Sequence, residues 1–82
     1  MEKLLLFLAK NIVSHPEVVK ITQVNNNGFV MFNLSVHKDD MGRVIGKEGK
    51  VIKAMRNLLR VKAAKLNLRF SLELKESQPL QS

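Results

Sequence analysis

Two glycines and two charged residues form the stretch of this sequence with the clearest chemical character. Gly46, Lys47, Glu48 and Gly49 make a GxxG tetrapeptide, which Lys50 follows directly. Glycine has no Cβ atom, so a second backbone can approach it closely. A helix that begins at Gly49 presents unpaired N–H groups and the positive end of its dipole to the loop. These features favour binding of a phosphate chain, with the lysines adding cationic attraction and Glu48 directed to solvent.

Other glycine-rich phosphate loops fit this stretch less well. Gly42, Gly46 and Gly49 give the spacing GxxxGxxG after a predicted helix, whereas the dinucleotide-binding fingerprint requires GxGxxG directly after a strand. The P-loop requires Ser or Thr after its lysine, and here Lys47 is followed by Glu48. A simple corner between two helices accounts for one glycine but poorly for three, because each glycine in a helix costs about 1 kcal/mol relative to alanine.

Most of the positive charge lies around the same loop. The chain carries a formal net charge of +7, and residues 38–65 contribute six of these charges because they hold nine basic and three acidic residues. The basic members of this window are Lys38, Arg43, Lys47, Lys50, Lys53, Arg56, Arg60, Lys62 and Lys65. A solvated helix face is the simpler explanation of such a pattern. Its concentration on one segment of a basic chain favours a polyanionic partner.

Hydrophobic periodicity and turn residues predict the elements that must position the loop. The expected elements are a helix at 2–14, a strand at 17–24, an Asn-Gly turn within 25–28, a strand at 29–36, a short helix at 41–45, a longer helix at 50–65 and a strand at 66–74. Pro16 is expected to end the first helix. Asp39 or Asp40 is expected to cap the short one.

This order predicts an α+β domain with a three-stranded mixed sheet and helices packed on one face. The last strand is reached by a crossover through the helix pair, so one parallel pairing is expected. A chain of 82 residues has room for one core, which we place at residues 2–74. Residues 75–82 are polar and are expected to form a flexible tail.

Composition argues against several classes of protein. The chain has no cysteine, which excludes disulfides and thiolate metal sites. The apolar run near the N-terminus is too short to span a membrane, so a soluble cytoplasmic protein is expected, with no membrane insertion. His15, His37, Asp39 and Asp40 form no recognisable catalytic or metal-binding pattern, and neither enzymatic activity nor a cofactor is expected. Phenylalanine is the only aromatic residue apart from histidine, which argues against an RRM-type stacking surface.

The sequence VIGKEGKVI, residues 44–52, resembles the central signature of K-homology (KH) domains: an aliphatic pair, GxxG and an isoleucine two residues further on. In such domains the GxxG loop clamps the backbone of about four nucleotides. Because a helix and a hairpin precede the motif and one strand follows it, the order is similar to type II, the prokaryotic form. The chain is short and has one such unit, with HPE after the first helix and GRVIGKEGK in the middle. In these respects residues 2–74 resemble small bacterial RNA-binding proteins with one KH unit. Asn67, where glycine is usual, and the tail depart from that pattern.

The resemblance implies a groove for single-stranded RNA between the helix pair and the adjacent strand. The implied RNA-binding residues are Gly42, Arg43, Val44, Ile45, Gly46, Lys47, Glu48, Gly49, Lys50 and Lys53. Gly42 would let a base approach the short helix. Whether Val44 or Ile45 faces the RNA is left open by the sequence.

An alternative function is protein association. The main apolar stripe of the long helix is expected to contain Val51, Ile52, Met55, Leu58 and Leu59. Ala54, Val61 and Ala64 lie outside this stripe and form a possible dimer interface. The resemblance also implies self-association or pairing with a larger partner that carries its own KH-like domain, and roles in RNA regulation, as an RNA chaperone, and in cell elongation and wall biogenesis. The RNA target and its base preference do not follow from the sequence.

Overall fold

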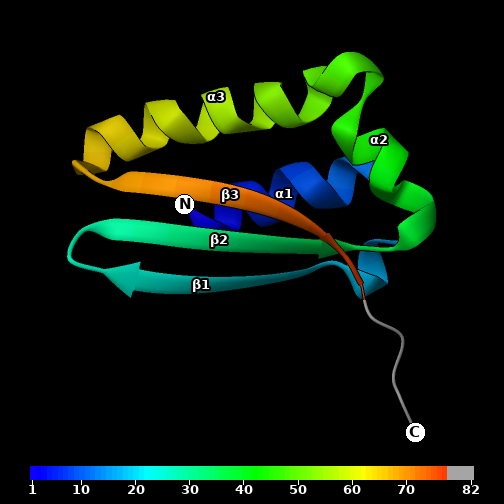
Figure 1. Ribbon diagram of the computed structural model, residues 1–82, viewed down its shortest axis with the longest axis horizontal. Helices are drawn as coiled ribbons and strands as arrows, with labels where there is room; N and C mark the ends of the chain where they lie inside the picture. Colours follow the sequence, from blue (N-terminus) through cyan, green and yellow to red (C-terminus); the bar gives the residue numbers. More distant parts are fainter. Residues whose placement is uncertain (78–82) are drawn as a thin grey trace, which may run out of the picture.

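The computed structural model describes residues 1–77 and shows a three-stranded sheet with its helices gathered on one face (Figure 1). In chain order the elements are α1 (Glu2–Ile12), η1 (Pro16–Val18), β1 (Lys20–Asn26), β2 (Phe29–Val36), η2 (Lys38–Asp40), α2 (Met41–Ile45), η3 (Lys47–Gly49), α3 (Lys50–Leu66) and β3 (Arg69–Glu76). The three η segments are short 3-10 turns. The order of helices and strands confirms the predicted α+β class and its two-layer arrangement.

The sheet has β2 at its centre and β3 at one edge. β1 runs antiparallel to β2, and the turn between them uses Asn27 and Gly28, whose φ angles are 50° and 84°. Positive φ at both turn residues is the geometry that tight hairpins favour. β3 runs parallel to β2, with Phe29 opposite Arg69 and Val30 opposite Phe70. The predicted crossover therefore leads to the expected parallel pair.

The core lies between the inner face of the sheet and the two longer helices. β2 alternates strictly, and its inward side chains are all buried: Val30, Phe32, Leu34 and Val36. They pack with Leu5 and Ala9 of α1 and with a stripe of α3 formed by Ile52, Met55 and Leu59. Burial of these apolar side chains supplies most of the driving force for a domain of this size.

Several details of the sequence interpretation differ from the structure. The first strand was expected at residue 17 but begins at Lys20, because Pro16 starts a 3-10 turn in which the Val18 N–H bonds to the His15 carbonyl. The fixed φ of proline suits the first position of such a turn. Leu58 was expected in the packed stripe but is 50% exposed. It lies about 100° around the helix from the centre of the buried stripe.

α3 and β3 end differently from the sequence expectation. Asn67 ends α3 with a φ of 58°, and the Leu68 N–H bonds to the Ala63 carbonyl at 2.9 Å. Asparagine thus takes the left-handed position that glycine usually fills. β3 continues through Lys75 and Glu76, which the sequence placed in the tail. Residues 78–82 of that expected tail lie outside the described residues. Within 1–77 no helix combines the length and the apolar character needed to cross a bilayer.

Candidate nucleic-acid interface

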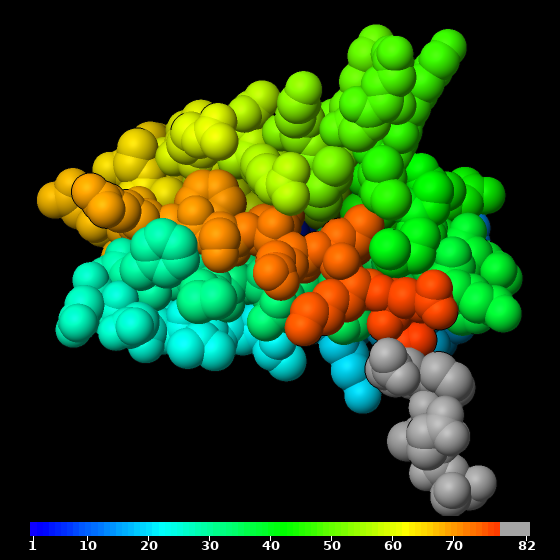
Figure 2. Space-filling model, in the orientation of Figure 1, coloured from blue at the N-terminus to red at the C-terminus, as the bar shows by residue number. Residues whose placement is uncertain are grey.

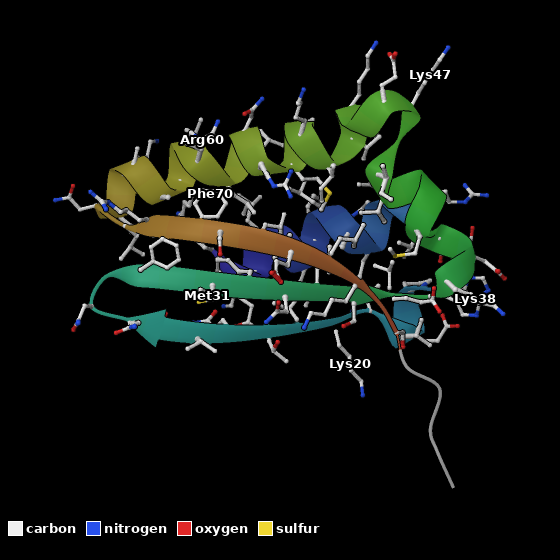
Figure 3. All side chains as sticks on the ribbon, viewed as in Figure 1. Lys20, Met31, Lys38, Lys47, Arg60 and Phe70 are labelled. Carbon is white, nitrogen blue, oxygen red and sulfur yellow. The ribbon has the colours of Figure 1, made fainter. Side chains whose placement is uncertain are left out.

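The GxxG loop is a sharply turned link between α2 and α3. α2 ends where the Gly46 N–H bonds to the Gly42 carbonyl at 2.8 Å, and the chain then turns through positive φ angles at Gly46, Glu48 and Gly49 of 76°, 57° and 74°. Its side chains stand above the rest of the surface, and that of Lys47 points away from the body of the domain (Figures 2 and 3). The turn therefore carries Lys47 and Lys50 at the surface, while the Gly49 and Lys50 N–H groups donate to the Gly46 and Lys47 carbonyls within the loop.

The three glycines near the loop serve different purposes. A Cβ atom on Gly46 would lie 2.4 Å from Val51 Cγ2 and 2.8 Å from the Val51 N atom, so Gly46 is required by the packing of the chain against itself. A Cβ atom on Gly42 or Gly49 would meet nothing within 4 Å. Gly42 and Gly49 therefore leave open space for a ligand, whereas Gly46 lets α2 and α3 approach each other.

A groove of about 470 Å³ lies between α2, α3 and β3. The residues that line it are Met41, Ile45, Ile52, Arg56, Leu72, Glu73, Leu74 and Lys75. It is visible in Figure 2 as the hollow bordered by the helix pair and the orange strand. Its volume is within the usual range for ligand sites, and its mixture of aliphatic side chains with a few charges suits flat, partly polar molecules such as nucleobases. The GxxG loop stands at one end of this groove.

Arg56 is a groove residue that we did not predict as a site residue. Its Nη2 atom donates a hydrogen bond to the Leu72 carbonyl oxygen at 3.1 Å, which ties α3 to the outer strand β3. β3 is an edge strand, so the carbonyls on its free side have no strand partner and can accept hydrogen bonds from side chains. The sequence could have indicated a groove position for Arg56, because Arg56 follows Ile52 by one helical turn. A cation at that position, however, is equally typical of a solvated helix face.

The structure separates the two aliphatic residues that the sequence left open. Ile45 is 38% exposed and lines the groove, whereas Val44 is fully buried in the core. Of the two, it is therefore Ile45 that faces the groove, while the Val44 side chain packs in the core. Its burial follows from the shortness of α2, which must use one of its few side chains to anchor itself.

The remaining predicted residues are at or near the surface. Gly42, Lys47, Glu48, Lys50 and Lys53 are exposed, and Gly46 and Gly49 are partly exposed. Arg43 is exposed but does not line the groove; its Nε atom lies 3.6 Å from Asp40 Oδ1. Ala54, Val61 and Ala64 are also exposed on α3.

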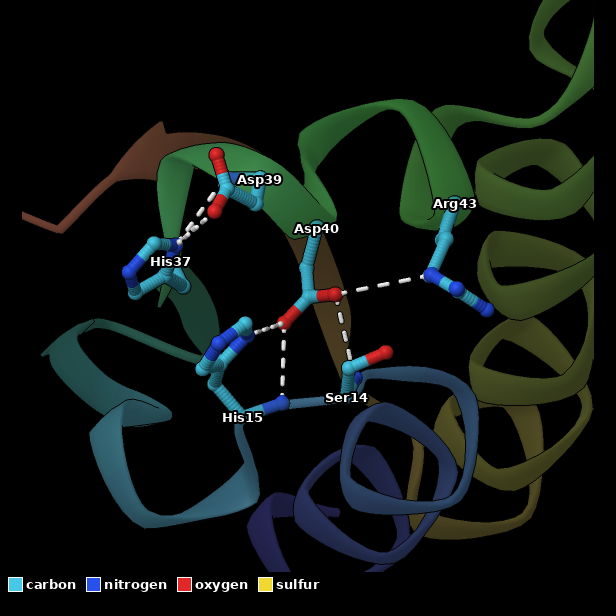
Figure 4. A network of polar contacts seen from close by, with 6 residues as sticks. All are labelled: Ser14, His15, His37, Asp39, Asp40 and Arg43. Carbon is cyan, nitrogen blue, oxygen red and sulfur yellow. Dashed lines mark hydrogen bonds and ion pairs between the residues drawn. The ribbon is translucent and has the colours of Figure 1, made fainter.

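Asp40 holds the start of α2 in place from inside the protein. Its carboxylate is 1% exposed and accepts hydrogen bonds from the Ser14 N–H, the His15 N–H and the His15 ring, each at 3.0 Å (Figure 4). Its side chain makes no helix cap, contrary to the sequence prediction. Instead, its hydrogen bonds connect the segment after α1 to the first residue before α2. They therefore hold in place the helix that leads into the GxxG loop.

We expect this carboxylate to make folding stability depend on acid pH. Burial alone would raise the pKa of Asp40, but the bonds from Ser14 and His15 outweigh burial and lower that pKa. A lowered pKa in the folded state means stability that is present above about pH 4 and lost as the pH falls through the folded value. Replacing Asp40→Asn should lower the melting temperature at neutral pH and weaken its dependence on acid, measured by circular dichroism. Asp39→Asn, at an exposed position, is the control. Parallel acid curves for Asp40→Asn and the parent protein would contradict this assignment.

Two histidines beside this network resemble a metal-binding group at first sight. Ligand atoms of His15, His37 and Asp39 lie within 4.8 Å of one another. The imidazole rings, however, are stacked with centroids 4.0 Å apart and planes 15° from parallel, so their nitrogens do not converge on one point. His37 Nδ1 also accepts a bond from the Asp39 N–H at 3.0 Å. Hydrogen bonding and ring stacking therefore explain why these three side chains lie close together.

The amino-acid sequence is similar to those of several known proteins. The sequence model of a family described as "KhpA/KhpB, KH domain" matches residues 2–74. A Chlamydia pneumoniae protein named RNA-binding protein KhpA is 44% identical over 78 residues, which cover 95% of this chain and all of that protein. The RNA-binding protein KhpA of Listeria monocytogenes is 43% identical over 76 residues, which cover 93% of this chain and all of the relative. That of Clostridium acetobutylicum is 36% identical over 74 residues, which cover 90% and 99% of the two chains.

Proposed function

The chain belongs to the KhpA/KhpB KH-domain family, and from this premise we propose that it binds single-stranded RNA at the GxxG loop and the adjoining groove. The observation that carries the proposal is the position of the loop: it stands at the head of an open groove and bears lysines on both sides of Glu48. The names of its relatives, which describe RNA-binding proteins, support the same conclusion. No catalytic step is part of this proposal.

In the proposed complex the phosphate backbone contacts the loop and the bases enter the groove. The exposed side chains of Lys47, Lys50 and Lys53 attract the phosphates electrostatically. Ile45, Ile52 and the leucines of β3 form an apolar floor against which a base can lie flat. Gly42 and Gly49 leave room for the nucleotide chain to pass close to the protein backbone.

The width of the site favours unpaired RNA. A groove of about 470 Å³ has room for individual bases, and such bases are accessible in a single strand but paired inside a duplex. Binding would hold short segments unpaired, which is the physical basis of an RNA chaperone or post-transcriptional regulator. A single site of this size is expected to bind weakly and with strong salt dependence, because much of the affinity comes from release of counterions.

The test is a fluorescence anisotropy titration of labelled single-stranded RNA, the matching duplex and single-stranded DNA. We expect binding of the single strand, weaker binding of the duplex and a linear fall of log affinity with log salt concentration. Equal affinity for duplex and single strand would contradict a role for the groove.

A second function, association through α3, rests on a separate observation. Val61 and Leu58 are 62% and 50% exposed, and with Ala54 they form an apolar ridge on the exposed surface of α3. An apolar ridge of this kind on a small domain favours contact with another chain. The candidate partners are a second copy of this chain and a larger KhpB-like protein with a KH domain, the two proteins that share the family description. Pairing would also raise apparent RNA affinity through avidity.

Val61→Asp is expected to prevent self-association by placing a charge in the centre of the ridge. Light scattering should then give the mass of one chain, 9.3 kDa, in place of twice that mass for the parent protein. Thr22→Asp introduces the same charge on the exposed face of the sheet and should leave the mass unchanged. Identical masses for Val61→Asp and the parent protein would count against the ridge as the contact surface.

A further inference from the structure

A second depression, of about 380 Å³, lies at the opposite end of α3 from the GxxG loop. Its lining includes two phenylalanines, Phe29 and Phe70, and two arginines, Arg60 and Arg69. Ala63 and Ala64 of α3 are the small residues that leave the space open. No acidic side chain lines it, whereas the groove near the loop includes Glu73.

The parallel pairing of β2 with β3 creates this arrangement from distant parts of the sequence. Phe29, the first residue of β2, lies opposite Arg69, the first residue of β3, and Phe70 follows opposite Val30. Arg60 comes from α3, where its Nη1 atom also donates a hydrogen bond to Asn57 Oδ1 at 2.8 Å. Figure 3 labels it on the helix, above the Phe70 ring of β3, and both residues line the depression. Phe29 is 36% exposed, so part of one aromatic ring is open to solvent.

This depression continues the seam that forms the proposed RNA groove. Arg56 lines the groove and Arg60 lines the depression, one helical turn or about 6 Å further along α3. Leu72 and Phe70 have the same relation on β3, two residues or about 7 Å apart on one face. The two hollows therefore follow one another along the same pair of elements.

Aromatic rings with arginines beside them and no carboxylate suit one class of ligand, a nucleobase attached to its phosphate. Bases stack on aromatic rings and on guanidinium planes, and arginine also pairs with the phosphate. We propose that the Phe29, Phe70, Arg60 and Arg69 depression is an additional nucleotide site, which holds a base of the same RNA strand beyond those bound at the GxxG loop. This inference rests on the proposed function, since it assumes that RNA occupies the groove.

The test compares a tetranucleotide with an octanucleotide, both fluorescein-labelled single-stranded RNAs of randomised sequence. The double variant Phe29→Ala/Arg69→Gln should weaken octanucleotide binding by about tenfold, the order expected for loss of one stacked base, and leave tetranucleotide binding unchanged. The control Met31→Ala/Lys20→Gln removes one exposed apolar side chain and one cation from the same sheet face, outside the depression, and should change neither affinity. Phe70 is left intact because it also packs against the core.

The outcomes separate this inference from the proposed function. Equal loss in the two double variants, or equal loss for the two RNA lengths, would overturn the additional site. Ultraviolet crosslinking of the octanucleotide gives a second readout: a nucleotide attached to a peptide containing Phe29 or Phe70 supports the site, and crosslinks confined to residues 41–56 overturn it. A change of mass in light scattering with unchanged RNA affinity would also overturn it, because the depression would then serve association. If Lys47→Asp/Glu48→Asp leaves both affinities unchanged, the proposed function itself fails.

Discussion

Replacing Lys47 and Glu48 together by aspartate is expected to lower the affinity for single-stranded RNA by about tenfold or more, which is a loss of about 1.4 kcal/mol or more. The change gives the exposed loop a net charge of −2 where it was neutral, directly at the position proposed for the phosphates. The fold should persist, because both side chains are exposed and aspartate tolerates the positive φ of 57° at residue 48. Anisotropy measures the affinity, and thermal unfolding checks the fold.

The control for that variant is Lys20→Asp, which lowers the net charge by the same amount. Lys20 extends from β1 on the side of the sheet away from the loop and the groove (Figure 3). If RNA is held at the GxxG loop, Lys20→Asp should retain most of the affinity at moderate salt, because charges separated by more than about 8–10 Å are largely screened. Equal losses in the two variants would mean that RNA is attracted by the overall charge of the protein and that the loop has no special role.

Much of the fold follows from local sequence signals. β2 alternates so regularly that its buried face could be read residue by residue, and the Asn-Gly turn fixes the hairpin register. The GxxG loop was predictable for the same reason, since Gly46 and Gly49 break an otherwise continuous helical pattern. These features depend on residues close together in the chain.

Three features that depend on contacts between distant residues were not predicted. Asp40 was expected to cap a helix, but its partners are Ser14 and His15, in the segment after α1. Arg56 acts in the groove only because β3 passes beside α3. Phe29 and Phe70 come together only through the parallel register of β2 and β3. In each case the sequence supplied a residue with several possible roles, and tertiary packing selected one.

Gly46→Ala is expected to destabilise the protein by about 2–4 kcal/mol, the largest effect on stability among the substitutions considered. Two costs add at this position. Gly46 has φ 76° and ψ 175°, a combination that only glycine adopts easily. A new Cβ atom would also overlap Val51, including its backbone N atom, which cannot move without shifting α3. Because total stability is about 4–12 kcal/mol for 82 residues, chemical denaturation should show a clear loss.

Gly49→Ala and Gly42→Ala turn this prediction into a comparison of two glycine functions. Gly49 has a positive φ but open space around it, so alanine should cost about 1 kcal/mol. Gly42 lies inside α2 with a helical backbone, and alanine there should be neutral or stabilise the protein by up to about 1 kcal/mol. If RNA passes close to α2, Gly42→Ala should nevertheless weaken RNA binding, since the added methyl group occupies space that the base needs. Gly42 would then serve RNA binding and lower the stability of α2, whereas Gly46 would serve the folding of the chain. Unchanged RNA affinity of Gly42→Ala would remove Gly42 from the binding site, and a Gly46→Ala protein as stable as the parent would show that α2 and α3 can separate without cost.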